Sequence, residues 1–188
     1  RKELLIEFDK AEKFKNDLKE LAINSVGLSH KSYEFNNHQY ALAIDAAAPV
    51  AAYRPGSLDD IPGTFEEVIK LAEKSKVILA IKPVDSISYF NSIAANMGHP
   101  INKNENEFMD KKIGLIILKL MKKLTDLVPK NCLSMNPINV LDYMSMNEDK
   151  LYCPILYGYS NYSRKGFRKN IVKFTNIPSF NEEKNNCK

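Results

Sequence analysis

Two aspartates lie where a carboxylate is chemically unusual. Asp45 interrupts the apolar run 40–52, where burying a carboxylate costs several kcal/mol unless the group is paired or hydrogen-bonded. It either pairs with Lys82 or Arg54 or caps a helix end, or it points from a strand end into a cleft. Asp85 follows a second apolar segment, and two carboxyl groups about 5–10 Å apart could act as acid and base on a glycoside. The sequence leaves these interpretations open.

The segment 82–86 (KPVDS) joins a short apolar run to the start of a predicted helix. Ligands of open α/β folds bind beyond the carboxyl ends of strands. The free backbone N–H groups at a helix start also favour anions and polar ligands. Lys82, Asp85 and Ser86 are therefore candidate ligand-binding residues. The alternative is an ordinary helix N-cap beside a solvated lysine.

The densest cluster of aromatic and polar residues is YGYSNYSR at 157–164. A tyrosine offers a flat apolar face and one hydroxyl, a combination that suits sugar rings, and Gly158 permits a tight turn. The alternative is a set of core tyrosines beneath a loop, because alternate residues of such a segment point in different directions. Stacking on nucleic-acid bases is disfavoured, because Arg164 and Arg168 are the only arginines nearby.

Motifs of the common enzyme and metal-site classes are missing from the sequence. There is no GxSxG, GxGxxG, Walker A loop or HExxH, and the three histidines are expected at the surface. The cysteines show no CxxC and no Cys/His ligand spacing. Cys132 and Cys153 could pair, but two buried free thiols are the favoured interpretation. We therefore expect no catalytic residue, no metal site and no cofactor.

The composition is that of a folded domain with a small net charge. The chain has 188 residues, of which 44% are hydrophobic, and a formal charge of +4. These values rule out disorder along most of the chain, and the scattered basic residues do not predict a nucleic-acid partner. No stretch approaches the ~20 apolar residues of a membrane span. The first 25 residues lack the pattern of a signal peptide, so we interpret the chain as processed or as an internal fragment.

Hydrophobic spacing and capping residues predict strands that alternate with helices. Thr64 opens a capping box, Asp110 caps a long helix, Asn136 precedes a proline at a helix start, and Asp85 or Ser86 caps a further helix. The predicted helices span 9–22, 64–74, 85–97, 110–128 and 136–146. Strands are predicted over 76–81, 151–156 and 170–174, and the run 40–52 is predicted to form either two buried strands or one strand that passes through a bend. Residues 23–38 are predicted to be loop and turn. This alternation is typical of an α/β layered domain.

Four stretches, in this order, resemble the central part of family 1 extracellular solute-binding proteins, the sugar-binding subunits of ABC importers. They are IDAAAPVAAYRP (44–55), IKPVDS (81–86), CLSMNPINVL (132–141) and YCPILYGYSNYSR (152–164). Between the first two lies TFEEVIKLAEKS, which is similar to the T-W-E-E helix start of these proteins, with Phe65 in place of Trp. The pattern spans residues 40–164, and the helix and turn at 9–38 also fit it.

The resemblance implies an α/β fold of the type II periplasmic-binding-protein kind, with two lobes joined by crossing strands. It places residues 1–44 in lobe one, 45–157 in lobe two, and 158–188 in the return crossing and part of lobe one. Family members are longer at both ends. The resemblance therefore implies a central fragment, mostly the second lobe with part of the first.

The same resemblance implies a ligand cleft between the lobes. It places one acid at the first crossing, a second acid at a helix start, and stacking aromatic residues after a strand. The chain has no Trp, so stacking on a ligand falls to Tyr or Phe. The candidate ligand-binding residues are Asp45, Ala46, Lys82, Asp85, Ser86, Tyr89, Tyr157, Tyr159 and Asn161.

The function that the resemblance implies is capture of a small polar solute, a carbohydrate by preference, and its delivery to an ABC transporter permease. The implied location is extracytoplasmic, in the periplasm or on the surface of a bacterium or archaeon. Membrane contact is expected only through the permease or a lipid anchor, and no nucleic acid is expected as a partner. One alternative is an α/β enzyme that acts on a carbohydrate with Asp45 and Asp85 as its acid/base pair. Another is a protein-interaction module with an exposed apolar patch.

Overall fold

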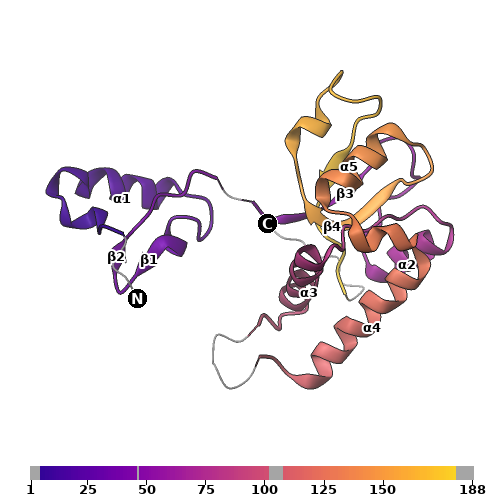
Figure 1. Cartoon of the computed structure of the whole chain (residues 1–188), viewed down its shortest axis with the longest axis horizontal. Coiled ribbons are helices and arrows are strands. Elements are labelled where there is room, and N and C mark those ends of the chain that lie inside the picture. Colours follow the sequence, from indigo (N-terminus) through magenta and orange to yellow (C-terminus); the bar gives the residue numbers. More distant parts are fainter. Residues whose placement is uncertain (1–4, 46, 102–107, 181–188) are drawn as a thin grey trace. The chain divides into compact units, whose positions relative to one another are not determined.

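The computed structural model describes residues 5–45, 47–101 and 108–180. The chain divides into two compact units, residues 1–47 and residues 48–188. The first unit contains α1, β1 and β2, and the second contains α2–α5 and β3–β5 (Figure 1). Residues 158–180 lie in the second unit with 48–157. The assignment of segments to lobes, made from the sequence, stays a prediction.

The first unit is a helix followed by a small hairpin. Helix α1 (Lys15–Asn24) follows two short 3-10 helices, and the hairpin pairs β1 (Glu34–Phe35) with β2 (His38–Gln39). Asn36 and Asn37, at φ +50° and +61°, form its two-residue turn. Asparagine tolerates this left-handed conformation well, which explains a hairpin where the sequence predicts loop and turn. The sequence predicts a helix over 9–22, which is correct in type but begins several residues too early.

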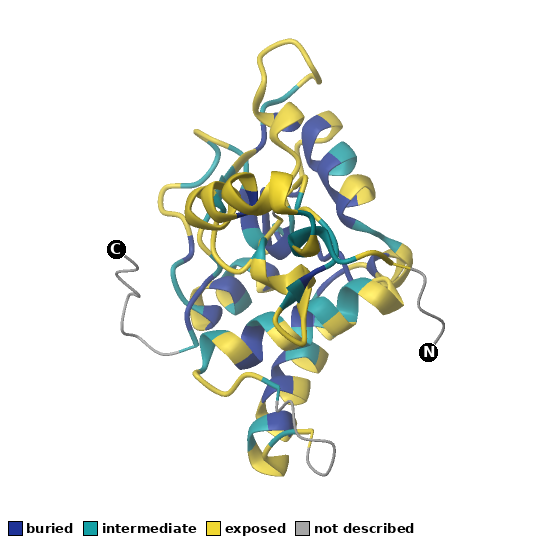
Figure 2. Cartoon of the chain, turned by 90° about the vertical axis from the view of Figure 1, so that its left-hand side faces the viewer, coloured by how far each residue is buried: buried dark blue, intermediate teal, exposed yellow. Residues whose placement is uncertain are grey.

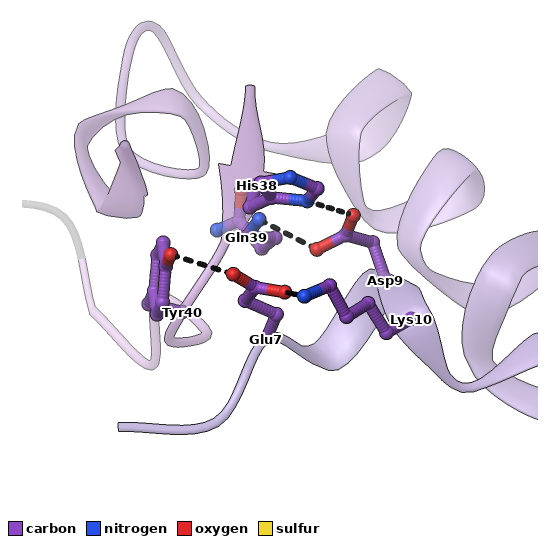
Figure 3. A network of polar contacts seen from close by, with 6 residues as sticks. All are labelled: Glu7, Asp9, Lys10, His38, Gln39 and Tyr40. Atoms are coloured by element: carbon purple, nitrogen blue, oxygen red, sulfur yellow. Dashed lines mark hydrogen bonds and ion pairs between the residues drawn. The ribbon is translucent and has the colours of Figure 1, made fainter. Parts of the chain in front are cut away.

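Polar contacts, rather than a large core, join the start of the first unit to its hairpin (Figure 3). Asp9 accepts hydrogen bonds from the backbone N–H of Gln39 at 2.9 Å and pairs with His38 Nδ1 at 2.8 Å. These hydrogen bonds lower the pKa of the Asp9 carboxyl, with that of His38 the larger cause. Glu7 accepts a hydrogen bond from the Tyr40 hydroxyl at 3.0 Å and also pairs with Lys10. Among the described residues of this unit, Leu18 is the only buried apolar side chain.

The second unit is built around a three-stranded antiparallel sheet. Strand β3 (Pro49–Tyr53) is central, with β4 (Tyr152–Tyr157) on one side and β5 (Lys173–Thr175) on the other. Pro49 faces Tyr157 and Tyr53 faces Tyr152 across the first pairing, with a bulge between Val50 and Ala52. The predictions for 151–156 and 170–174 are therefore confirmed as strands, with shifted ends.

Two predicted strands are corrected by the structure. The described residues 41–45, 47 and 48 form no strand, and Ile44 is 99% exposed. Only β3, which has a partner on both edges, is extended in the sheet, because an apolar run becomes a strand where other strands satisfy its backbone groups. Residues 77–81 are buried as predicted, but they make only a parallel bridge at Val77 with Tyr152. At the end of this segment the N–H of Lys82 instead donates to Met135 O.

The described residues of the second unit form four α-helices: α2 (Phe65–Glu73), α3 (Pro83–Asn96), α4 (Lys111–Leu127) and α5 (Pro137–Met146). The predicted caps of three are confirmed, at Thr64, Asp110 and Asn136. The predicted cap of α3 is wrong, because the helix begins at Pro83 with Lys82 as a cap residue that makes no side-chain bond. Proline suits the first helical position, where no backbone donor is needed.

The core of the second unit lies between the sheet, the segment 77–81 and the inner faces of the helices. Its largest fully buried side chains include Tyr89, Tyr152, Phe65 and Leu141. Figure 2 shows helices striped by burial, with buried residues on one side and exposed residues on the other. This packing fixes the start of α3, the start of α5 and the end of β4 relative to one another.

Candidate functional site

A small pocket lies in the second unit where the carboxyl end of β4 meets the first turns of α3 and α5. We call it the strand-end pocket. It is lined by Pro49, Ala80, Asp85, Ser88, Tyr89, Pro137, Ile155, Leu156 and Tyr157. Its volume is about 10 Å³, close to the ~10–15 Å³ that one water molecule occupies. The pocket lies beyond the carboxyl end of a strand, where ligands of α/β folds bind.

Two buried polar atoms without a partner lie at the strand-end pocket. Asp85 Oδ2 and the Tyr89 hydroxyl are shielded from solvent, and the described residues give neither of them a hydrogen bond. The two residues are four apart on α3, so their side chains share one face of the helix. An unsatisfied buried polar group costs about 1–3 kcal/mol. A ligand hydroxyl could satisfy both atoms, donating to the carboxylate and accepting from the phenol.

The surroundings shift the titration of both groups. Burial raises the pKa of Asp85, and the positive charge of Lys82 opposes this shift with a smaller effect. Burial also raises the pKa of Tyr89 well above its ordinary value, with smaller contributions from Cys153 and Tyr152. Tyr89 therefore remains a neutral hydroxyl that can both donate and accept a hydrogen bond.

The walls of the pocket come from three elements. Pro49 begins β3 and faces Tyr157, the last residue of β4 and half-buried. Pro137 begins α5, whose capping box joins Asn136 and Asn139 through two side-chain to backbone bonds of 2.9 and 3.1 Å. Two prolines and a capped helix start thus hold the rim with little backbone freedom.

Gly158 is required after β4 for a reason that the sequence does not reveal. It was expected to permit a tight turn, but its φ is not in the left-handed region. A Cβ at this position would lie 2.9 Å from Val50 Cγ2 and 3.4 Å from the Phe174 ring. The close approach of β3 and β5 therefore excludes a side chain next to Tyr157.

The structure brings together three of the residues predicted from the sequence, namely Asp85, Tyr89 and Tyr157. Ser86 lies on the same helix but donates its hydroxyl to Ile81 O at 2.8 Å, and so braces the start of α3. Lys82 is exposed beside the pocket.

Of the other predicted residues, Tyr159 and Asn161 are not among the lining residues. Both are exposed in the segment after β4. Asp45 is exposed in the first unit, and Ala46 lies outside the described residues. The ligand-binding roles of all nine residues stay predictions.

Six of the nine lining residues are not among those predicted from the sequence, namely Pro49, Ala80, Ser88, Pro137, Ile155 and Leu156. Pro49, Ser88 and Pro137 become neighbours only through tertiary packing. A proline after Asn136 predicts the start of a helix at Pro137. The sequence does not show, however, that this helix start lies next to α3.

A second, more open pocket of about 540 Å³ lies beside the first and shares Pro49 with it. Its other lining residues are Val50, Ile61, Pro62, Gly63, Asn96, Thr175, Asn176, Ile177 and Ser179. None of these lining residues carries a charge.

The predicted free thiols are confirmed, because Cys132 and Cys153 are both buried and unpaired. Burial raises the pKa of the Cys132 thiol and raises that of Cys153 to about 12, so both are protonated and unreactive at neutral pH. Within the described residues, no group of three or more His, Cys, Asp or Glu side chains could hold a metal ion. No helix in the described part of the chain is long and apolar enough to span a membrane.

Comparison of structures finds solved proteins that share the fold of this chain. No protein-family model matches the sequence, and no curated protein matches it significantly. Maltose-bound MalE3 from T. maritima matches with a TM-score of 0.73 and 14% identity, over 94% of this chain and 48% of that chain. A solute-binding protein from Agrobacterium radiobacter K84, in complex with ribitol, matches with a TM-score of 0.71 and 16% identity, over 94% and 49%.

A third similar structure is UgpB from Mycobacterium tuberculosis in complex with glycerophosphocholine. It matches with a TM-score of 0.65 and 11% identity, over 94% of this chain and 48% of that chain. The chain thus spans about half the length of the structures that it matches. The fold expected from the sequence is confirmed: the chain has the fold of about half of a type II periplasmic solute-binding protein.

Proposed function

We propose that the protein binds a small, uncharged polyhydroxylated solute of the carbohydrate or polyol class at the strand-end pocket and delivers it to an ABC permease. The observation that carries this proposal is a pair of buried atoms, Asp85 Oδ2 and Tyr89 OH, to which the described residues give no hydrogen bond, in a pocket that Tyr157 also lines. A sugar hydroxyl both donates and accepts hydrogen bonds, so one such group can donate to the Asp85 carboxylate and accept from the Tyr89 hydroxyl. The tyrosine ring can cover an apolar sugar face.

The fold supports this class of ligand. The matched MalE3 structure holds maltose, and the Agrobacterium radiobacter protein holds ribitol. The small volume of the strand-end pocket suits one hydroxyl of a ligand rather than a whole ring. We infer that the pocket is the deep end of a larger binding surface.

The pocket does not favour the enzyme alternative. Two-carboxylate glycoside chemistry needs a second acid near the first. Among the described residues that line the pocket, Asp85 is the only acid. Its raised pKa is explained by burial alone, without a neighbouring carboxylate. We therefore propose a binding protein without catalytic activity, located outside the cytoplasm where a permease can receive its solute.

A thermal-shift panel tests the proposal. The intact protein is heated with maltose, galactose, ribitol, mannitol and glycerophosphocholine, and each compound is then analysed for chemical change. A ligand present at 100 times its dissociation constant adds about 2.7 kcal/mol to stability, which shifts the melting temperature measurably.

A selective shift by a sugar or polyol that is recovered unchanged, and that is lost in Tyr89→Phe, supports the proposal. Consumption of a compound would instead support the enzyme alternative. A shift with glycerophosphocholine alone, or with no compound, would contradict the carbohydrate class.

A further inference from the structure

The net positive charge of the chain is concentrated on one helix. Helix α4 carries five lysines and one aspartate, so its formal charge is +4, and the whole chain also has +4. The rest of the chain is therefore electrically balanced. The lysines are Lys111, Lys112, Lys119, Lys122 and Lys123, and all are exposed. The one acid, Asp126, is paired with Lys122 at 2.7 Å.

The exposed side of α4 also carries large apolar residues. Leu115, Ile116 and Leu118 are 46%, 40% and 54% exposed. The opposite side, with Ile117 and Leu124 fully buried, packs against α2 and α3 (Figure 1). Core packing therefore explains only the inner side. We call the exposed lysines together with Leu115, Ile116 and Leu118 the α4 face.

Helix stability does not explain the lysines at the start of α4. Lys111 and Lys112 occupy its first two positions, and the first turn holds no acid. Cations are unfavourable there, because the N-terminal end of the helix dipole is positive. Among the described residues at this helix end, Asp110 offsets part of this charge, since it accepts from the backbone N–H groups of Lys112 and Ile113 at 2.8 and 3.0 Å. The lysines weaken the helix end slightly, so their placement calls for another explanation.

We propose that the α4 face binds the surface of a phospholipid bilayer that contains anionic lipid. A helix of this length presents a strip about 25 Å long, with cations that pair with lipid phosphates and apolar side chains that enter the headgroup region. The cations are all lysines. Lysine suits a diffuse anionic surface, whereas arginine provides the two-pronged recognition typical of specific protein sites. This inference goes beyond the proposed solute binding and does not depend on it.

Vesicle sedimentation tests the inference with a matched pair of variants. The intact protein is mixed with vesicles of phosphatidylcholine, with or without phosphatidylglycerol, at low salt and at about 1 M NaCl, where the Debye length is ~3 Å. Lys119→Glu/Lys123→Glu reverses two exposed charges spaced four residues apart on α4. Lys70→Glu/Lys74→Glu makes the same charge change, at the same spacing, at exposed positions of α2 and its C-cap. Circular dichroism and melting temperature confirm that both variants fold.

We expect the protein to bind the vesicles that contain phosphatidylglycerol and not those of phosphatidylcholine alone. This binding should be lost at high salt. The α4 variant is expected to bind roughly 25-fold more weakly or worse, since each lysine near an anionic surface accounts for about a fivefold change. The α2 variant is expected to bind almost normally. Three outcomes overturn the inference: no binding to anionic vesicles, equal losses in the two variants, or cross-linking of the α4 face to an acidic permease segment without any vesicle binding.

Discussion

The Tyr89 hydroxyl is a buried donor that the described residues leave without an acceptor. Tyr152 is a buried tyrosine of the same core, but its hydroxyl donates to Pro62 O at 3.3 Å. We therefore expect Tyr89→Phe to raise the free energy of unfolding of the ligand-free protein by about 1–3 kcal/mol, and Tyr152→Phe to lower it by about 0.5–1.5 kcal/mol. Urea unfolding measures both. Equal losses in the two variants would show that Tyr89 has an acceptor after all.

Asp85 should make the protein less stable as the pH rises, which is the reverse of the usual effect of an aspartate. Its pKa is raised in the folded protein above its ordinary value of 3.8, so the folded state holds the proton more tightly than the unfolded chain. Its contribution to stability is therefore present below pH 3.8 and is lost as the pH rises through the folded pKa. Asp85→Asn should match the parent in acid and become the more stable protein at higher pH. Parallel curves of melting temperature against pH would contradict this.

Asp9 provides the opposite control. Its pKa is lowered in the folded protein by its hydrogen bonds to His38 and Gln39. The contribution of the Asp9 carboxylate to folding stability is thus present above the pKa that this group has in the unfolded chain. It is lost as the pH falls through the lower pKa of the folded protein. In an NMR titration of the carboxyl carbons, Asp85 should titrate above 3.8 and Asp9 below it.

Tyr157 lines the strand-end pocket together with Tyr89, whereas Tyr159 is exposed and is not a lining residue. We expect Tyr157→Ala to weaken solute binding by roughly 1–3 kcal/mol, the scale of a lost buried aromatic contact. Tyr159→Ala should cost less. Calorimetric titration with the solute found by thermal shift measures both. An unchanged affinity in Tyr157→Ala would remove this residue from the site, and a larger loss in Tyr159→Ala would move the site outward along the segment after β4.

Among the elements, the start of α5 connects local capping to the pocket. The Asn136 side chain accepts from Asn139 N at 2.9 Å, and Pro137 behind it lines the pocket. Asn136→Ala should lower the free energy of unfolding by about 1 kcal/mol. It should also weaken solute binding, because the cap that positions Pro137 in the pocket wall is removed. Asn131→Ala, at an exposed position of the preceding 3-10 helix, should change stability by less than about 0.5 kcal/mol. Equal effects would mean that the cap does not hold this helix.

The elements that the sequence predicts well are those with a local cause. The caps at Thr64, Asp110 and Asn136 lie within one turn of the groups that they bind, so the sequence specifies them directly. The predicted strands at 40–52 and 76–81 failed in part, because strand formation depends on partners distant in the sequence. Burial of 77–81 was predictable from its apolar run, but its single bridge to β4 was not.

The candidate site shows the same division. Asp85 and Tyr157 were predicted, because both follow apolar segments and begin or end an element. Pro49 and Ser88 were not, since they reach the pocket only when β3 pairs with β4 and α3 packs beside it. The described residues leave Asp85 Oδ2 and the Tyr89 hydroxyl without a hydrogen-bond partner, which is a tertiary property. The sequence could therefore name these residues but could not show why they suit a ligand hydroxyl.

Over the whole molecule, the two units differ in how much core they bury. Leu18 is the only buried apolar side chain described in the first unit, whereas the second has a continuous core around Ala51, Tyr89 and Tyr152. Small domains with little buried surface are marginally stable. Opening of the first unit should therefore cost much less free energy than opening of the second.

Native-state hydrogen exchange measures this difference directly. For a second unit with a global stability of about 5–15 kcal/mol, the amides of β3 and β4 should exchange roughly 1000-fold or more slowly than those of α1. Asn136→Ala should then speed exchange throughout the second unit and leave α1 unchanged, because the two units open separately. Equal protection of α1 and β3, or a response of α1 to Asn136→Ala, would show instead that they unfold together as one cooperative body.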